Sequence, residues 1–292
     1  MKPRDLADLL LLAMLWGGSF LFMRYAAPTF GVLPLMWLRV AIATACLLPL
    51  LAWRGQTGAL VERAGPIAVM GLFNSAIPFV LIAWATLSIT AGLASILNAT
   101  VPLLTALIGA VWLRERLSVP TMAGLAIGMA GVLMLAADQA DFRPGGSGWA
   151  LLAMLGATSC YGYAANFTRR HLAGVPATAN AAGSQLVSAL ALAPFALAHW
   201  PAVTPGPMAW GAAAALGVGC TGLAYVLFFR LIERVGASRA VTVTFLVPVF
   251  GTLWGVLFLG EPVTASMLVG GAVVLVGTGL STGVIRWPAK AG

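Results

Sequence analysis

The sequence predicts an all-α integral membrane fold of ten transmembrane helices, arranged as two five-helix repeats in inverted orientation. Of the 292 residues, 61% are apolar and 8% are charged, whereas soluble domains have about 25% charged residues. Apolar stretches of about 20 residues, the length that crosses a bilayer as a helix, follow one another along nearly the whole chain. The second half of the chain also repeats features of the first half at a fixed distance.

The helix boundaries follow from charged residues, prolines and glycines between the apolar stretches. A turn is needed at Ser88 to Thr90, because a helix through this gap would be too long for a membrane. The stretch from Leu6 to Ala26 exceeds the roughly 7–15 apolar residues of a signal-peptide core, so we interpret it as the first helix. The predicted helices cover residues 6–26, 33–53, 66–87, 91–113, 119–137, 148–168, 178–198, 208–230, 237–259 and 263–285.

The positive charges favour an orientation with both termini in the cytoplasm. This orientation puts only Arg24 and Arg143 on the opposite side, while Arg39 lies within the second helix. The other 13 of the 16 cations are cytoplasmic: Lys2, Arg4, Arg54, Arg63, Arg114, Arg116, Arg169, Arg170, Arg230, Arg234, Arg239, Arg286 and Lys290. Tryptophans near predicted helix ends fit the headgroup layer; they are Trp53, Trp84, Trp149, Trp200, Trp210 and Trp287.

Several classes of protein are disfavoured by the sequence. The net charge of +8 does not indicate a nucleic-acid partner, because Lys and Arg are scattered between apolar stretches instead of forming one basic surface. Cys46, Cys160 and Cys220 lie in apolar stretches without a CxxC pair, which predicts helix packing. The histidines are isolated, and no Walker A motif or metal-ligand spacing occurs. We therefore predict no catalytic residue, no metal and no cofactor.

The internal repeat has an offset of 146 residues. Val101-Pro102 leads to Glu115 as Val247-Pro248 leads to Glu261. Further pairs are Gly71 with Gly217, Gly124 with Gly270, Gly131 with Gly277 and, at an offset of 145, Arg24 with Arg169 and Pro49 with Pro194. Because five helices are an odd number, the repeat of residues 146–292 is inverted relative to that of residues 1–145, with Glu115 cytoplasmic and Glu261 outside. Inverted repeats are typical of secondary transporters, whose site lies between the halves, although duplication can also be purely architectural.

Short motifs accompany this repeat. They are Leu15-Trp16-Gly17-Gly18-Ser19-Phe20, Leu38-Arg39, the segments Pro102 to Glu115 and Pro248 to Glu261, and glycine-rich fifth and tenth helices. Together they resemble the drug/metabolite transporter superfamily in its ten-helix EamA-type form, over nearly the whole chain, and are most similar to bacterial amino acid exporters such as the YddG-like aromatic amino acid exporters. The resemblance implies a multi-pass protein of the bacterial inner (plasma) membrane, export of a small molecule, and a central cavity lined by helices one to four and six to nine.

Three prolines are candidates for gates or hinges. Pro102 and Pro248 remove backbone donors from repeat-equivalent helices and free the carbonyl groups near Asn98 and Thr244. Pro78 follows Asn74 by four residues in the third helix. Such breaks often coincide with binding sites in transporters, but proline kinks without a function are also common.

Polar and aromatic side chains at middle depth are the candidate substrate-binding residues, because polar groups in hydrocarbon usually face a cavity or another helix. The polar ones are Ser19, Asn74, Asn98, Ser159, Gln185, Thr221 and Thr244, and the aromatic ones are Trp16, Phe79, Tyr161, Tyr163 and Tyr225. This mixture suits a neutral or zwitterionic amphipathic ligand. The alternative is that the amides only bridge helices and the rings only pack.

Arg39 is the most distinctive of the candidate substrate-binding residues. It lies about two turns into the second helix, where no Asp or Glu is at the same depth. Its guanidinium requires backbone carbonyls, a distant acid such as Glu261, a route to the outer surface, or the carboxylate of a substrate. The repeat position holds Gln185, so the charge is not duplicated. Without a buried acid we expect facilitated or weakly coupled transport, with Glu261 as a possible titrating group.

The main hypothesis is a secondary carrier that exports amino acids, aromatic ones included, by alternating access. Rivals within transport are a drug exporter and a nucleotide-sugar carrier, of which the latter requires paired cations for phosphates. A lipid enzyme requires a clustered constellation at one membrane face, and a scaffold does not require the prolines and amides inside helices. Small residues in the fifth and tenth helices predict close packing, within one chain or in a homodimer, so both a monomer and a homodimer stay open.

Overall fold

The computed structural model describes residues 1–137, 141–143 and 146–285. The predicted repeat boundary at residue 145, together with Asp138, Arg286, Trp287 and Lys290, lies outside this part. The described part forms helices and short connections without a β-strand. The α-helices are α1 Pro3–Phe30, α2 Val32–Trp53, α3 Thr57–Glu62, α4 Ala64–Gly71, α5 Ile77–Ala85, α6 Ala91–Asn98, α7 Val101–Trp112, α8 Val119–Ala137, α9 Ser147–His171, α10 Ala177–Ala198, α11 Pro207–Ala214, α12 Ala224–Val235, α13 Ala237–Ala240, α14 Val243–Leu259 and α15 Ala265–Ser281. Two π-helical segments, η1 Leu72–Ala76 and η2 Ala215–Leu223, continue α4 and α11.

Seven helical stretches of the described residues are long and apolar enough to cross a membrane. They are Pro3–Phe30, Val32–Trp53, Ala64–Ala85, Ala91–Trp112, Val119–Ala137, Ala177–Ala198 and Pro207–Val235. The helices α14 and α15 are apolar but shorter, and α9 adds a helix of 25 residues. The chain is an all-helical multi-pass membrane protein, as predicted. The count of ten spans and the inversion of the halves stay predictions.

The three prolines that were expected to interrupt helices differ in their surroundings. Pro102 is the second residue of α7, and the helix is broken between Asn98 and Val101. Pro78 is the second residue of α5, directly after η1. For Pro102 this position costs no helical hydrogen bond, because the first N–H groups of a helix have no partner. Pro78 instead lies inside the continuous helical stretch Ala64–Ala85, where it removes a backbone donor next to η1. Pro248 lies inside α14, which continues through it, and as a proline it offers no N–H to the carbonyl group of Thr244 four residues before it. A separate turn lies upstream, between α13 and α14.

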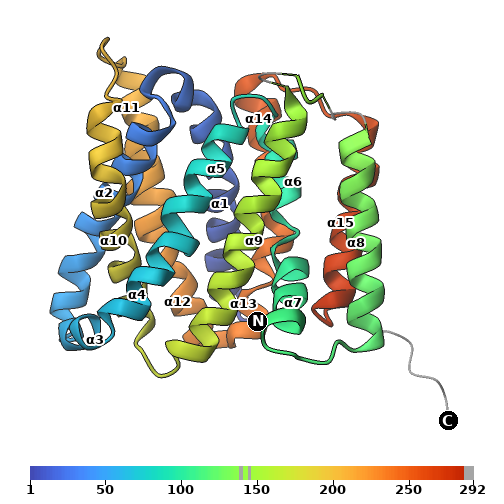
Figure 1. The fold of residues 1–292 in the computed structure, drawn as a ribbon, viewed down its shortest axis with the longest axis horizontal. Coiled ribbons are helices and arrows are strands. Elements are labelled where there is room, and N and C mark those ends of the chain that lie inside the picture. Colours follow the sequence, from blue (N-terminus) through green and yellow to red (C-terminus); the bar gives the residue numbers. More distant parts are fainter. Residues whose placement is uncertain (138–140, 144–145, 286–292) are drawn as a thin grey trace.

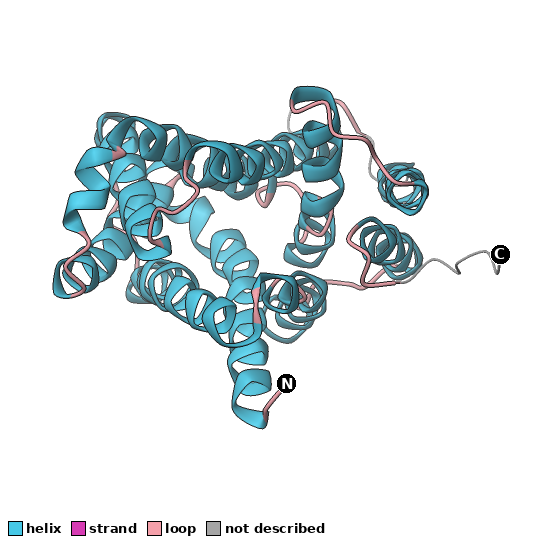
Figure 2. Cartoon of the chain, turned by 90° about the horizontal axis from the view of Figure 1, so that it is seen from below, coloured by secondary structure: helices cyan, strands magenta, loops and turns pink. Residues whose placement is uncertain are grey.

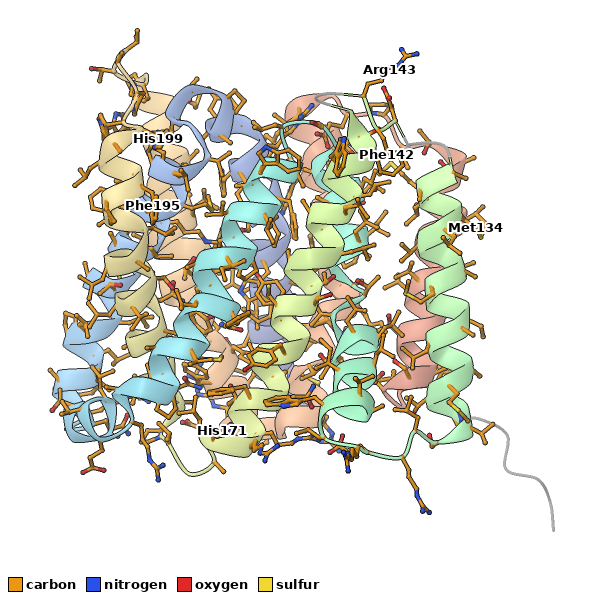
Figure 3. All side chains as sticks on the ribbon, in the orientation of Figure 1. Met134, Phe142, Arg143, His171, Phe195 and His199 are labelled. Carbon is orange, nitrogen blue, oxygen red and sulfur yellow. The ribbon has the colours of Figure 1, made fainter. Side chains whose placement is uncertain are left out.

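The connections lie at two opposite ends of the bundle. Phe142, Arg143 and His199 are at one end and His171 is at the other (Figure 3); these are called the Arg143 end and the His171 end. The connection from α14 to α15 lies at the Arg143 end, and that from α7 to α8 lies at the His171 end (Figure 1).

The helices α8 and α15 pack on each other beside the rest of the bundle (Figures 1 and 2). Glycines form their contact, as predicted. A Cβ atom added at Gly124 would lie 2.5 Å from the carbonyl oxygen of Gly277, and one added at Gly131 would lie 2.9 Å from that of Gly270. The two backbones therefore approach more closely than larger side chains permit.

Candidate functional site

The buried Arg39 of α2 lies among groups from three other elements. Its Nε donates a hydrogen bond of 3.0 Å to Oγ1 of Thr221 in η2. Its Cζ lies 3.7 Å from the centroid of the Phe79 ring in α5, and its Nη1 lies 3.6 Å from Sδ of Met23 in α1. Only 5% of the residue is exposed, and none of the ion pairs in the described part of the chain includes it. The guanidinium therefore lacks an acidic partner.

Gln185 of α10 makes a corresponding contact, from the second half of the chain to the first. Its Nε2 donates a hydrogen bond of 2.8 Å to Oγ of Ser75 in η1. Its Oε1 is buried without a hydrogen-bond partner among the described residues. Arg39 and Gln185 are 146 residues apart, and so are Ser75 and Thr221. Exchanging the two halves of the chain thus converts one hydrogen bond into the other.

Both acceptor hydroxyl groups belong to π-helical segments, Ser75 to η1 and Thr221 to η2. In η2, the Thr221 hydroxyl donates a hydrogen bond of 2.8 Å to the carbonyl oxygen of Leu216, five residues before it, which is the spacing of a π-helical turn. The same hydroxyl oxygen then accepts the hydrogen bond from Arg39. π-helical turns occur frequently at functional sites.

A second polar contact joins the halves beside Arg39. Nδ2 of Asn74 donates a hydrogen bond of 3.0 Å to the Tyr225 hydroxyl. Tyr161 and Tyr225 are both close enough to Arg39 to interact with it electrostatically. The structure thus brings together Arg39, Asn74, Phe79, Tyr161, Gln185, Thr221 and Tyr225 from the predicted set, with Ser75 and Met23 in addition.

Trp16 connects to this polar cluster through aromatic rings. Its ring centroid lies 5.3 Å from that of Phe228, which lies 6.3 Å from that of Phe229. The Phe229 ring in turn stacks on Tyr225 at 5.7 Å. A row of rings therefore extends from α1 to the hydroxyl that accepts from Asn74.

The other predicted site residues make contacts of their own. Tyr163 packs against Phe73 and Trp112, with centroid distances of 4.8 and 5.0 Å, in a row of rings that reaches His171. The hydroxyl of Thr244 donates locally to the carbonyl group of Val241. Ser19 is buried in α1, and Oδ1 of Asn98, at the end of α6, is buried without a partner among the described residues.

Two expectations about Arg39 do not hold in this conformation. Glu261 is not its partner, because the Glu261 carboxylate pairs with Arg24 at 3.5 Å. Arg39 does not extend to the surface either, since it is buried. Ser75 and Met23 were missed because neither stands out in an apolar stretch, although the repeat offset pairs Ser75 with Thr221 and could have identified it. In the described part, no group of three His, Cys, Asp or Glu residues could hold a metal ion.

The contact between Asn74 and Tyr225 makes a testable contribution to stability. In a double-mutant cycle of Asn74→Leu and Tyr225→Phe, we expect a coupling energy of about 0.6 kcal/mol, the mean for hydrogen bonds between membrane helices. Unfolding of the purified variants in detergent measures this value. Strictly additive effects of the two substitutions would show that the hydrogen bond does not stabilise the fold.

Comparison with known proteins adds independent information. The chain matches the model of the EamA-like transporter family at residues 7–137 and 148–283. A "Probable terminal-alkyne amino-acid exporter" of Streptantibioticus cattleyicolor is 26% identical over 269 residues, which are 92% of this chain and 90% of that protein. An "Uncharacterized transporter" of Archaeoglobus fulgidus is 22% identical over 264 residues, 90% of this chain and 92% of the other. A protein of known crystal structure aligns over 100% of both chains with a TM-score of 0.69 and 22% identity, a likeness of fold alone.

Proposed function

This chain belongs to the EamA-like transporter family, and we propose that it exports amino acids, aromatic ones included, by alternating access between two inverted five-helix repeats. The repeats are residues 1–145 and 146–292, and they provide ten membrane spans in a bacterial inner membrane. Both termini are cytoplasmic in this proposal, so the Arg143 end faces outward and the His171 end faces the cytoplasm.

Contacts that recur with the halves exchanged support the inverted repeat. Arg39 with Thr221 corresponds to Gln185 with Ser75 at the offset of 146 residues. The ion pair of Arg24 with Glu261 corresponds to that of Arg169 with Glu115, at offsets of 145 and 146. In the glycine contact of α8 with α15, Gly124 with Gly277 corresponds to Gly270 with Gly131. Such reciprocity is expected of halves related by a pseudo-two-fold axis in the membrane plane.

The observation that carries the choice of substrate is the buried, acid-free Arg39. A buried cation without a partner is costly, and a ligand carboxylate supplies the missing charge with hydrogen bonds that fit the planar guanidinium. The Phe79 ring adds aromatic surface against it, and Tyr161 and Tyr225 lie within electrostatic range of it. The name of the relative from Streptantibioticus cattleyicolor, an amino-acid exporter, agrees with a ligand that carries both a carboxylate and an apolar side chain.

Counterflow into proteoliposomes tests the proposal. Vesicles loaded with one unlabelled amino acid are expected to accumulate the same labelled amino acid, because the carrier exchanges substrate across the membrane without an energy source. The panel includes aromatic and aliphatic amino acids, their decarboxylated amines, cationic dyes and sugars. Exchange of dyes or sugars without exchange of any amino acid would overturn the assignment in favour of a drug or sugar exporter.

A further inference from the structure

An acidic side chain at the Arg143 end joins segments from both halves of the chain. Both oxygens of the Glu261 carboxylate, in the connection from α14 to α15, accept from the backbone N–H of Ala91, at 3.1 and 2.9 Å. The Oε1 atom also lies 3.5 Å from Nε of Arg24 in α1. The Arg24 Nη1 donates to the carbonyl oxygen of Thr86 at 2.5 Å. These four residues, called here the Glu261 latch, tie α1, the end of α5 and the start of α6 to the end of α14.

The helices beside this latch are in close contact. A Cβ atom added at Gly251 of α14 would overlap the side chain of Ser95 in α6. One added at Gly92 of α6 would lie 3.2 Å from Cα of Thr252 in α14. Ser95 is completely buried. The helices α6 and α14 are therefore in tight contact beside the latch.

The corresponding acid at the His171 end is held differently. Glu115 pairs with Arg169 at 2.6 Å, and both side chains are about half exposed, at 48% and 57%. Within the described residues, its carboxylate has no bond like those of Glu261 to Ala91, and α7 has no contact with α13 or α14 comparable to that of α6 with α14. The Glu261 side chain, by contrast, is only 10% exposed. The two acids that correspond at the repeat offset are thus held differently.

We infer that the Glu261 latch is the gate of the Arg143 end, and that it must release Ala91 and Arg24 before this end opens. The inference rests on the alternating access of the proposed function. A shielded carboxylate that binds a cation and a backbone N–H holds strongly, since charge-assisted hydrogen bonds are about twice as strong as neutral ones. An exposed ion pair such as that of Glu115 contributes little. Loss of the Glu261 charge therefore shifts the population toward a conformation in which α6 and α14 separate.

The test measures how fast a thiol at the closed contact reacts. Ser95→Cys is introduced after replacement of the three free cysteines, Cys46, Cys160 and Cys220. The purified full-length protein is exposed in detergent, where both ends are accessible, to a hydrophilic methanethiosulfonate reagent. We expect Glu261→Gln to raise the reaction rate at Ser95→Cys by about tenfold or more, which matches the loss of one charge-assisted hydrogen bond. The matched variant Glu115→Gln is expected to leave the rate unchanged.

Two results would overturn the inference: equal rates with and without Glu261→Gln, or an equal rise in Glu115→Gln. A thiol at Ser184→Cys, a buried position of α10, reports unfolding and stays unreactive in a folded variant. If Glu261→Gln makes the thiol at Ser184→Cys reactive as well, the variant is unfolded and Arg24→Gln is used in its place. An unchanged reaction rate at Ser95→Cys in the Arg24→Gln variant would then reject the latch. The reaction requires no substrate, so a failed counterflow experiment rejects the choice of substrate without rejecting the latch.

Discussion

Arg39→Gln is expected to abolish most amino acid exchange while the protein stays folded. A hydrogen bond to a charged group contributes about 1.5–3 kcal/mol, so the loss of the guanidinium is expected to raise the substrate concentration needed for half-maximal exchange by about 10- to 100-fold. The empty protein loses a buried cation that no acid among the described residues neutralises. Its melting temperature is therefore expected to be unchanged or higher. Counterflow and thermal unfolding of the same preparation measure the two effects.

The decarboxylated amine of a transported amino acid is the control ligand. It has no carboxylate for Arg39, so its weak exchange is expected to be equal in the parent protein and in Arg39→Gln. Arg39→Lys retains the charge but not the planar geometry and is expected to show intermediate exchange. Full amino acid exchange by Arg39→Gln would assign Arg39 to helix packing alone.

Gly277→Leu is expected to separate α8 from α15 and to remove most of the folded protein. A Cβ atom at this position would overlap the backbone nitrogen of Gly128 and lie 2.6 Å from the carbonyl oxygen of Gly124. Backbone atoms cannot rotate away as a side chain can, so the cost exceeds the roughly 1–3 kcal/mol of ordinary overpacking. The yield of monodisperse protein and its melting temperature in detergent measure the loss.

Gly211→Leu is the matched control. Gly211 lies in α11, and a Cβ atom there meets nothing within 4 Å. Because leucine favours the helix more than glycine does, this variant is expected to be at least as stable as the parent. Equal stability of Gly277→Leu and Gly211→Leu would show that the contact of α8 with α15 does not support the fold.

Much of the fold could be predicted because hydrocarbon leaves a chain few choices. Backbone N–H and C=O groups in a membrane must form their hydrogen bonds within helices. The apolar stretches, with the charged residues, prolines and glycines between them, were therefore sufficient to locate most helices. The first helix extends to Phe30 instead of residue 26, because the stretch after Ala26 stays apolar around Pro28. The π-helical turns of η1 and η2 were not predicted, since one extra residue in a turn leaves no mark on hydropathy.

The candidate site could be predicted in part. Arg39 and Gln185 stood out because a charge and an amide are rare in apolar stretches. Ser75 looked like an ordinary small residue in an apolar stretch; its hydrogen bond to Gln185 reveals it, and in the sequence only the repeat offset to Thr221 marks it. The contacts of Tyr163 with Trp112 and of Thr244 with Val241 depend on which way each helix is rotated, and this rotation is set by packing between helices distant in sequence.

The unequal pair of Arg39 and Gln185 has a consequence for the cargo. In the proposed inverted repeat, Arg39 and Gln185 occupy corresponding positions, but only Arg39 carries a charge. A solute with a single acidic group therefore has one preferred binding orientation between the two halves, with its acidic group toward α2. An asymmetric pair of this kind thus suits a solute whose two ends differ in charge.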